Sequence, residues 1–178
     1  KEFADKFGLE IRNVVDPVAV REDAKDKKPD LKKNKVVAVV TNDNAELLTI
    51  NWGKLGGRLF IGGTAEGDEE PEVTALREVT EETGYNDLEV EEIGEENFFY
   101  KYYAFSKQET HEIETTFVKL RLKSDSRQEQ NLDESEKGKF TVEWVSRSQA
   151  EKEVVEPLHR YGYEKFIQKK PYGGEGVL

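Results

Sequence analysis

The chain has 178 residues, and its 38 acidic residues outnumber its 27 lysines and arginines, giving a formal net charge of −11. This length allows one domain with a proper core, and the negative charge argues against a broad electrostatic grip on nucleic acid, although a local basic patch is compatible with it. There is no cysteine, which excludes disulfides, thiolate zinc sites and a cysteine nucleophile. No apolar run approaches roughly 18 residues and no signal peptide opens the chain, so we expect no membrane contact and a cytoplasmic location.

Secondary structure is predicted in chain order from apolar periodicity and turn residues. Residues 1–15 predict a short helix end and a strand, and the almost wholly charged residues 21–35 predict an exposed linker. Apolar runs and alternation predict strands over 36–40, 45–52, 58–61, 88–93, 97–105, 115–123 and 140–145. A polar turn at 106–111 predicts a hairpin, 124–139 predicts an acidic loop, and residues 151–168 have helical spacing.

The stretch 63–85, GTAEGDEEPEVTALREVTEETGY, is the most informative part of the chain. It holds eight acidic residues and one arginine, a local net charge of −7. Such a charge density opposes folding unless something positive binds there, and a divalent metal ion is the simplest candidate.

Within this stretch the residues from Pro71 to Gly84 predict a helix. Proline is tolerated in a first helical turn, and glycine is the usual residue just past a helix end. One apolar stripe, formed by Val73, Leu76 and Val79, is predicted to pack inward.

Three carboxylates share another face of the predicted helix, because Glu78, Glu81 and Glu82 are spaced at i, i+3 and i+4. Hard oxygen ligands at this spacing suit Mg²⁺ or Mn²⁺. The alternative is a solvated acidic helix. That alternative must also explain the glycine pair before the helix, Arg77 within the acids, and the glycine at the stop.

The stretch is similar to the Nudix box: a glycine, five residues, Glu, seven residues, and then Arg-Glu-apolar-x-Glu-Glu-x-Gly-apolar. The matching residues are Gly63, Glu69, Arg77, Glu78, Val79, Glu81, Glu82, Gly84 and Tyr85. The chain departs from the family at Ile61, and at Gly67-Asp68, where the family often has proline and Pro-Gly. The resemblance implies an α/β/α sandwich around a mixed β-sheet, and Mg²⁺-dependent (or Mn²⁺-dependent) hydrolysis of a nucleoside diphosphate linked to another moiety.

The resemblance also implies roles for individual residues. Metal ligands fall on Glu78, Glu81 and Glu82, with the Gly62 carbonyl as a further ligand. Glu69 and Arg77 form a supporting ion pair. The general base is left open between the box and the following acidic loop; the candidates are Glu81, Glu82, Glu129, Asp133, Glu134 and Glu136.

Aromatic and histidine residues give weaker indications. A residue of the aromatic strand could stack on a base or could simply belong to the sheet core; the candidates are Phe99, Tyr100, Tyr102 and Tyr103. His111 and His159 lack a partner motif, and we expect both at the surface.

The two ends of the chain resemble a different family. Residues 1–15, KEFADKFGLEIRNVV, and 172–178, YGGEGVL, look like segments of the editing domain of leucyl-tRNA synthetases. The chain also has no methionine and begins with lysine. We therefore expect an excised fragment in which a Nudix-like domain, 34–168, is inserted between flanking segments 1–33 and 169–178, with tRNA a partner only through the parent synthetase.

Three functions compete at this point. The first is a metal-dependent diphosphohydrolase, the second is a non-catalytic accessory module that supports the editing domain and tRNA positioning, and the third is a sensor that binds a nucleotide without turning it over. The intact acid set favours the hydrolase.

Overall fold

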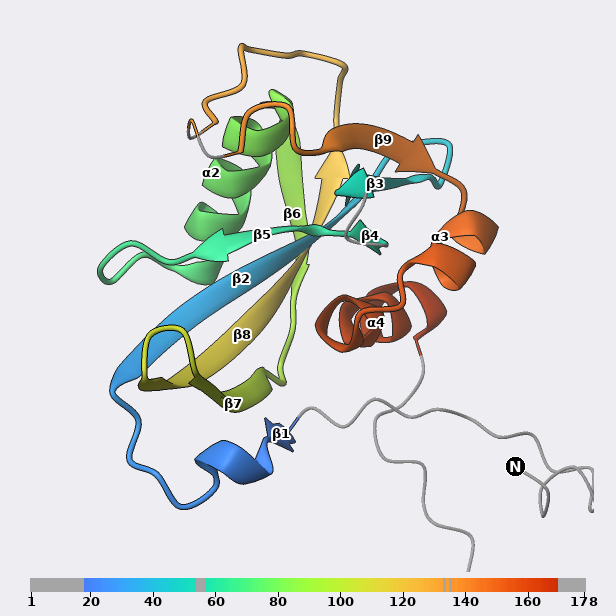
Figure 1. Ribbon diagram of the computed structural model, residues 1–178. Coiled ribbons are helices and arrows are strands. Elements are labelled where there is room, and N and C mark those ends of the chain that lie inside the picture. The colour runs from blue at the N-terminus through green and yellow to red at the C-terminus, as the bar shows by residue number, and fades with distance from the viewer. Residues whose placement is uncertain (1–17, 54–56, 133, 135, 170–178) are drawn as a thin grey trace, which may run out of the picture.

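The computed structural model describes residues 18–53, 57–132, 134 and 136–169 (Figure 1). Within these residues nine strands form one mixed sheet: β1 Val18–Val20, β2 Leu31–Thr41, β3 Leu47–Asn51, β4 Arg58–Leu59, β5 Ile61–Thr64, β6 Leu88–Ile93, β7 Phe98–Ala104, β8 Glu109–Leu122 and β9 Thr141–Val145. The helical segments are a 3₁₀ turn Glu22–Ala24, α2 Pro71–Thr83, α3 Arg147–Glu153, α4 Pro157–Tyr163 and a π-helical turn Glu164–Gln168.

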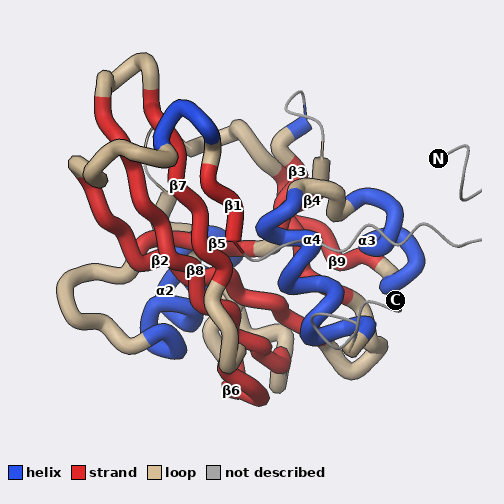
Figure 2. The backbone as a smooth tube through the Cα atoms, turned by 90° about the horizontal axis from the view of Figure 1, so that it is seen from below, coloured by secondary structure: helices blue, strands red, loops and turns tan. Residues whose placement is uncertain are grey.

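A long parallel pair, β2 and β8, forms the centre of the sheet. It runs in register from Leu31 opposite His111 to Thr41 opposite Arg121. β8 also pairs antiparallel with β6 and β7, while β2 pairs antiparallel with β5 and then with β3. β1 lies beside β7 in parallel (Figure 2).

The two faces of β2 pack against different helices. Val36, Ala38 and Val40 share one apolar cluster with residues of α2, while Val37 and Val39 share the other with residues of α4. Because both faces are buried, the run 36–40 is continuously apolar and not alternating. The predicted α/β/α sandwich is therefore confirmed, with α2 on one face of the sheet and α4 on the other (Figure 1).

Several element boundaries differ from the sequence prediction. Residues 31–35 are not part of a linker but the first half of β2, paired with β8, and their lysines alternate between exposed and half-buried positions. The hairpin turn is shorter than predicted because β8 already begins at Glu109. The predicted helix 151–168 is broken into three pieces, since Pro157 starts a new helix and cannot continue the preceding one.

The helix α2 spans the predicted residues, and Gly84 follows it in the left-handed conformation at φ 82°. The predicted inward stripe is wrong at Val73, which is 50% exposed, whereas Thr74, Ala75 and Val79 are buried. A spacing of i, i+3, i+6 drifts by about 120° around a helix, so a stripe whose last member is buried leaves its first member at the rim.

Both histidines were predicted at the surface, and this prediction is wrong. His111 is buried within β8, and the imidazole Nδ1 of His159, on α4, accepts the backbone N–H of Phe60 at 3.1 Å. Burial, with the nearby charge of Lys35 adding to it, lowers the pKa of His159 to about 4. A lone histidine in a sequence carries no signal for such a backbone partner.

The pKa of His159 makes the stability of the fold dependent on pH. Its folded-state value lies below the unfolded value near 6.5, so the stability gained from neutral His159 is complete above pH 6.5 and is lost as the pH falls toward about 4. We expect His159→Asn, whose amide oxygen can accept the same N–H, to lack this loss. The difference in unfolding free energy between the two proteins should change by up to about 3 kcal/mol between pH 7 and pH 4, measured by urea denaturation. Parallel curves for the two proteins would contradict the assignment.

The structure describes only part of the two predicted flanking segments. An insertion predicts that the flanks 1–15 and 172–178 meet in space, but both lie outside the described residues. Of the proposed flanking segment 1–33, the described part contributes β1 and the start of β2 to the sheet.

In the part of the chain that the structure describes, no helix is long and apolar enough to cross a membrane.

Candidate active site on helix α2

Arg77 is the centre of the ionic network on α2. Its guanidinium contacts both carboxylate oxygens of Glu69, at 3.2 and 3.0 Å, and donates to the Thr64 carbonyl at 3.1 Å. One Nη also reaches Glu78 at 2.9 Å and Glu81 at 3.1 Å. A single arginine therefore connects the loop before the helix, the end of β5 and two acids of the helix.

Glu69 is held more tightly than an ion pair alone would hold it. It accepts the Thr74 hydroxyl at 2.8 Å and the Glu66 backbone N–H at 3.2 Å. The hydrogen bond to Arg77, followed by that from Thr74, lowers the pKa of Glu69 to about 2. The predicted Glu69–Arg77 pair is thus present as a contact, and Thr74 is a partner that the sequence reasoning missed.

Glu82 is the least satisfied carboxylate of the acid set. Its Oε2 is buried and has no hydrogen-bond partner among the described residues. Burial raises the pKa of Glu82 to about 8, and the charges of Glu78, Glu136 and Glu81 add to this rise. Burial also raises the pKa of Glu78, although its contact with Arg77 opposes the rise. Buried carboxylates are costly unless a positive charge compensates them.

The three acids are neighbours but do not already converge as ligands. Among the described residues, no group of three or more acidic or histidine side chains is arranged to hold a metal ion. Oxygens of Glu78 and Glu81 are engaged by Arg77 instead. The donor set nevertheless fits a hard divalent cation, since all the acids offer oxygen and Glu82 Oε2 has no other partner.

The glycine pair before the helix leaves room for one of these acids. A Cβ on Gly63 would lie 1.8 Å from the carboxylate of Glu78, and a Cβ on Gly62 would lie 2.8 Å from the Val36 carbonyl. Glycine at 63 is therefore required by the position of Glu78. The sequence pattern alone does not reveal that the Glu78 carboxylate occupies the place of a side chain at position 63.

We expect Gly63→Ala to displace the Glu78 carboxylate while leaving the fold intact, since the far end of a flexible side chain can move. The melting temperature without metal should stay within about 2–4 °C of the wild type, equivalent to about 1 kcal/mol. We expect millimolar Mg²⁺ to raise the melting temperature of the wild type by mass action, and we expect this rise to be largely lost in the variant. Thermal scans of both proteins with and without Mg²⁺ measure this, and an equal Mg²⁺ shift in both would contradict it.

The loop after β8 is fastened to the end of α2. The backbone N–H of Gln128 donates to the Gly84 carbonyl at 2.8 Å, and that of Asn131 donates to the Glu81 carbonyl at 2.9 Å. The Gln130 amide also donates to the Glu82 carbonyl. Carbonyls in a last helical turn lack partners within the helix, and the loop supplies them here.

The four candidate acids of this loop differ in exposure and in partners. Glu129 is exposed, and Glu134 is exposed and paired with Lys137 at 2.5 Å. Glu136 is half-buried, and its charge helps to raise the pKa of both Glu78 and Glu82. Asp133 lies outside the described residues. Glu136 is thus the described loop acid that faces the acid set.

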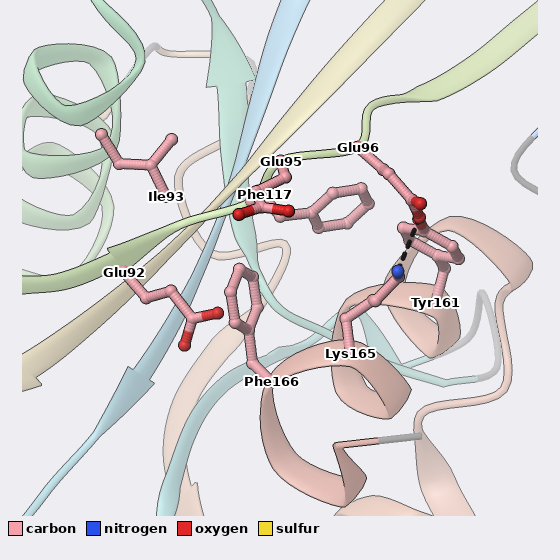
Figure 3. A pocket seen from close by; sticks show the side chains of 9 residues that line it. Glu92, Ile93, Glu95, Glu96, Phe117, Tyr161, Lys165 and Phe166 are labelled. Carbon is pink, nitrogen blue, oxygen red and sulfur yellow. Dashed lines mark hydrogen bonds and ion pairs between the residues drawn. The ribbon is translucent and has the colours of Figure 1, made fainter. Parts of the chain in front are cut away.

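A hollow of about 210 Å³ lies apart from these acids, on the α4 face of the sheet (Figure 3). Phe117 and Phe166 form its apolar wall, and Lys165 is ion-paired with Glu96 at 2.6 Å. The Tyr161 hydroxyl donates to the same carboxylate at 3.1 Å. Lys165, the one cation that lines the hollow, is therefore already neutralised by Glu96. The hollow contributes nothing to the site on α2.

The comparisons with known proteins agree with this fold. The family model described as NUDIX domain matches residues 31–168. A NUDIX hydrolase from Nitrosomonas europaea is similar in structure at 22% identity and a TM-score of 0.53, over 82% of this chain and 93% of that one. The MutT protein from Methanosarcina mazei Go1 is similar at 19% identity and a TM-score of 0.51, over 80% and 96%. These two likenesses show the fold. Among curated proteins, none matches.

The described part of the chain is thus a mixed sheet between two helical layers, with a glycine loop that leads into a helix with an acidic face. The chain belongs to the NUDIX family, because the family model covers most of its length.

Proposed function

We propose that the chain hydrolyses a nucleoside diphosphate linked to another moiety, in a reaction that depends on Mg²⁺ or Mn²⁺ and takes place at the acid face of α2. The observation that carries this proposal is Glu82 Oε2, which is buried beside two other carboxylates without a hydrogen-bond partner. A domain kept only for packing has no use for a carboxylate whose burial raises its pKa to about 8.

In this proposal Glu78, Glu81 and Glu82 hold the cation, with the Gly62 carbonyl as a further ligand. The cation would neutralise the diphosphate and lower the pKa of the attacking water. Arg77, clamped by Glu69, positions the helix against the loop that carries the glycines. Its contacts with Glu78 and Glu81 hold those two carboxylates in place on the acid face.

The candidates for the general base are Glu81, Glu82 and the loop acids. We propose Glu136, because it is the described loop acid whose charge acts on both Glu78 and Glu82. The hydrogen bonds between the loop and α2 would fix its distance from the reacting water.

The setting of the domain is a separate proposal. That it is an insertion in a leucyl-tRNA synthetase, with tRNA reached through the parent protein, rests on the resemblance of residues 1–15 and 172–178 alone. The comparisons add no support for a synthetase. A cytoplasmic location rests on composition in the same way.

A screen of the purified chain against diphosphate-linked nucleotides tests the proposed reaction. We expect turnover of at least one compound with Mg²⁺ and none with a chelator. Binding of a nucleotide without turnover, for every compound and with either Mg²⁺ or Mn²⁺, would favour the sensor or accessory module instead.

A further inference from the structure

Phe60 lies at the point where the chain passes from one part of the sheet to another. The preceding strand, β4, pairs antiparallel with β3, and the following strand, β5, pairs antiparallel with β2. In the described part of the chain Phe60 belongs to neither of these ladders, although β4 and β5 follow one path across the sheet (Figure 1). Phe60 is only 1% exposed, so its backbone N–H is shielded from water and needs a partner from outside the sheet.

His159 on α4 is that partner. Its Nδ1 accepts the Phe60 N–H at 3.1 Å, which leaves the proton of the neutral ring on Nε2. The start of the helix holds the imidazole in place, because Pro157 begins α4 and Glu156 accepts the backbone N–H of His159 at 3.1 Å. The helix α4 therefore contacts the backbone of the crossing point directly, and not only through apolar side chains.

The crossing point is two residues away from the glycine pair of the acid site. Phe60 packs in the apolar cluster that contains residues of α4, and Ile61 packs in the one that contains residues of α2. β5 is then packed tightly onto β2, because a Cβ on Gly62 would lie 2.8 Å from the Val36 carbonyl. A movement of Phe60 would therefore be carried along β5 to the glycine pair and would not be absorbed in a gap beside β2.

Two side chains of the ionic network on α2 rest on β5. The Glu78 carboxylate occupies the place of a side chain at Gly63, where a Cβ would lie 1.8 Å from it. Arg77 donates to the Thr64 carbonyl at 3.1 Å. The position of β5 therefore sets where these two side chains lie, and Glu78 is one of the proposed ligands of the cation.

We propose that His159 is a positioning residue for the acid site: by holding the Phe60 N–H it fixes the glycine pair, and the glycine pair fixes the Glu78 carboxylate. Because α4 and α2 cover opposite faces of the sheet, the imidazole acts on the acids only through the backbone of β5. The inference rests on the proposed function and adds to it a residue from the other face of the sheet.

Spectra of the metal-free protein test this positioning without turnover. His159→Leu removes the acceptor, whereas His159→Asn keeps one, since its amide oxygen can take the place of Nδ1. Both variants lack the ring, so a difference between them is not an effect of the ring current. In ¹H–¹⁵N correlation spectra we expect His159→Leu to shift the amide resonances of Gly62 and Gly63, and His159→Asn to leave them close to the wild type. Unchanged glycine resonances in His159→Leu, or equal shifts in both variants, overturn the proposal.

Titration calorimetry with Mg²⁺ measures the consequence for the acid site. We expect the Kd of Mg²⁺ to rise about tenfold in His159→Leu, which is the lower end of the range for residues that support a metal ligand. The Kd should stay within about twofold of the wild type in His159→Asn. A Kd in His159→Leu equal to that of the wild type contradicts the positioning role.

Tyr163→Phe supplies the matched control. Tyr163 is on the same helix, and its hydroxyl donates to the Arg147 carbonyl at 3.0 Å, so this variant also loses a side-chain hydrogen bond to the backbone. It should lose a comparable amount of stability in urea denaturation but keep the Mg²⁺ affinity and the glycine resonances of the wild type. Equal weakening of Mg²⁺ binding in Tyr163→Phe and His159→Leu would show that lost stability is the cause, and would remove the positioning role.

His159→Gln is the second variant if His159→Leu does not fold. Its amide lies one bond further from the backbone, so it displaces the acceptor instead of removing it, and it should shift the same glycine resonances. Resonances of Gly62 and Gly63 that stay unchanged in His159→Gln then overturn the proposal.

Absence of Mg²⁺ binding to the wild type would remove the proposed function and not the contact. The glycine resonances of the metal-free variants would still decide whether His159 holds β5 in place.

Discussion

Glu82→Gln should lower the kcat/KM of Mg²⁺-dependent hydrolysis by at least about 100-fold while the protein stays folded. Replacing the outer-shell partner of a metal ligand typically costs 10–100-fold, and Glu82 is proposed as a ligand itself. Glutamine matches glutamate in size but is neutral and a weaker ligand. Because the buried oxygen has no partner in the wild type, no existing hydrogen bond is lost. Initial rates with the best compound of the screen, with circular dichroism of both proteins, measure the effect.

The matched control is Glu72→Gln, which makes the same chemical change on the same helix. Glu72 has no side-chain hydrogen bond or ion pair among the described residues. The kcat/KM of Glu72→Gln should stay within about twofold of the wild type, because this half-buried side chain loses no hydrogen bond or ion pair. Turnover of Glu82→Gln within a few-fold of this control would mean that the acid face of α2 is not the active site.

Gly84→Ala should destabilise the fold by about 3 kcal/mol, through two effects that add. Alanine in the left-handed conformation costs about 1 kcal/mol, and Gly84 has φ 82°. A Cβ there would also lie 2.4 Å from the backbone carbonyl of Gln128, which must move away. That movement breaks the bond from the Gln128 N–H to the Gly84 carbonyl, which adds about 2 kcal/mol. The expected fall in melting temperature is about 6–12 °C.

Gly138→Ala has only the first effect, so the difference between the two variants measures the second. Gly138 also has a positive φ, of 70°, but nothing lies within 4 Å of the place of its Cβ. Its variant should lose only about 1 kcal/mol. Equal losses in the two variants, measured by thermal scans, would show that the contact between α2 and the loop adds nothing to stability.

The strongest local signals predicted the fold well. The apolar run 36–40 indicated a strand buried on both faces, and Pro71 and Gly84 marked the two ends of α2. The predictions that were wrong concern residues whose structure depends on partners distant in the sequence. The lysines of 31–35 form a strand because β8 lies beside them, and Val73 is exposed because the sheet contacts α2 around Val79.

The candidate site was predictable in part. Helical spacing put Glu78, Glu81 and Glu82 on one face. The resemblance to the Nudix box implied the Glu69–Arg77 pair, and the contacts of Arg77 agree with it. The sequence did not reveal the contribution of Thr74, because a threonine on an inner helix face has no distinctive pattern. Nor did it separate Glu136 from its neighbours, since only the folded loop brings one of these acids near the helix.

The parallel pairing of β2 with β8 has a consequence for how the chain folds. Each residue of β2 pairs with one that lies 80 positions later, as Leu31 does with His111. Closing so long a loop costs conformational entropy before any contact repays it, so formation of this pair is expected to be slow. During synthesis, α2 leaves the ribosome well before β8 does. The mutually repelling carboxylates of α2 therefore lie beside a sheet that still lacks β8 until the chain has been synthesised past residue 121.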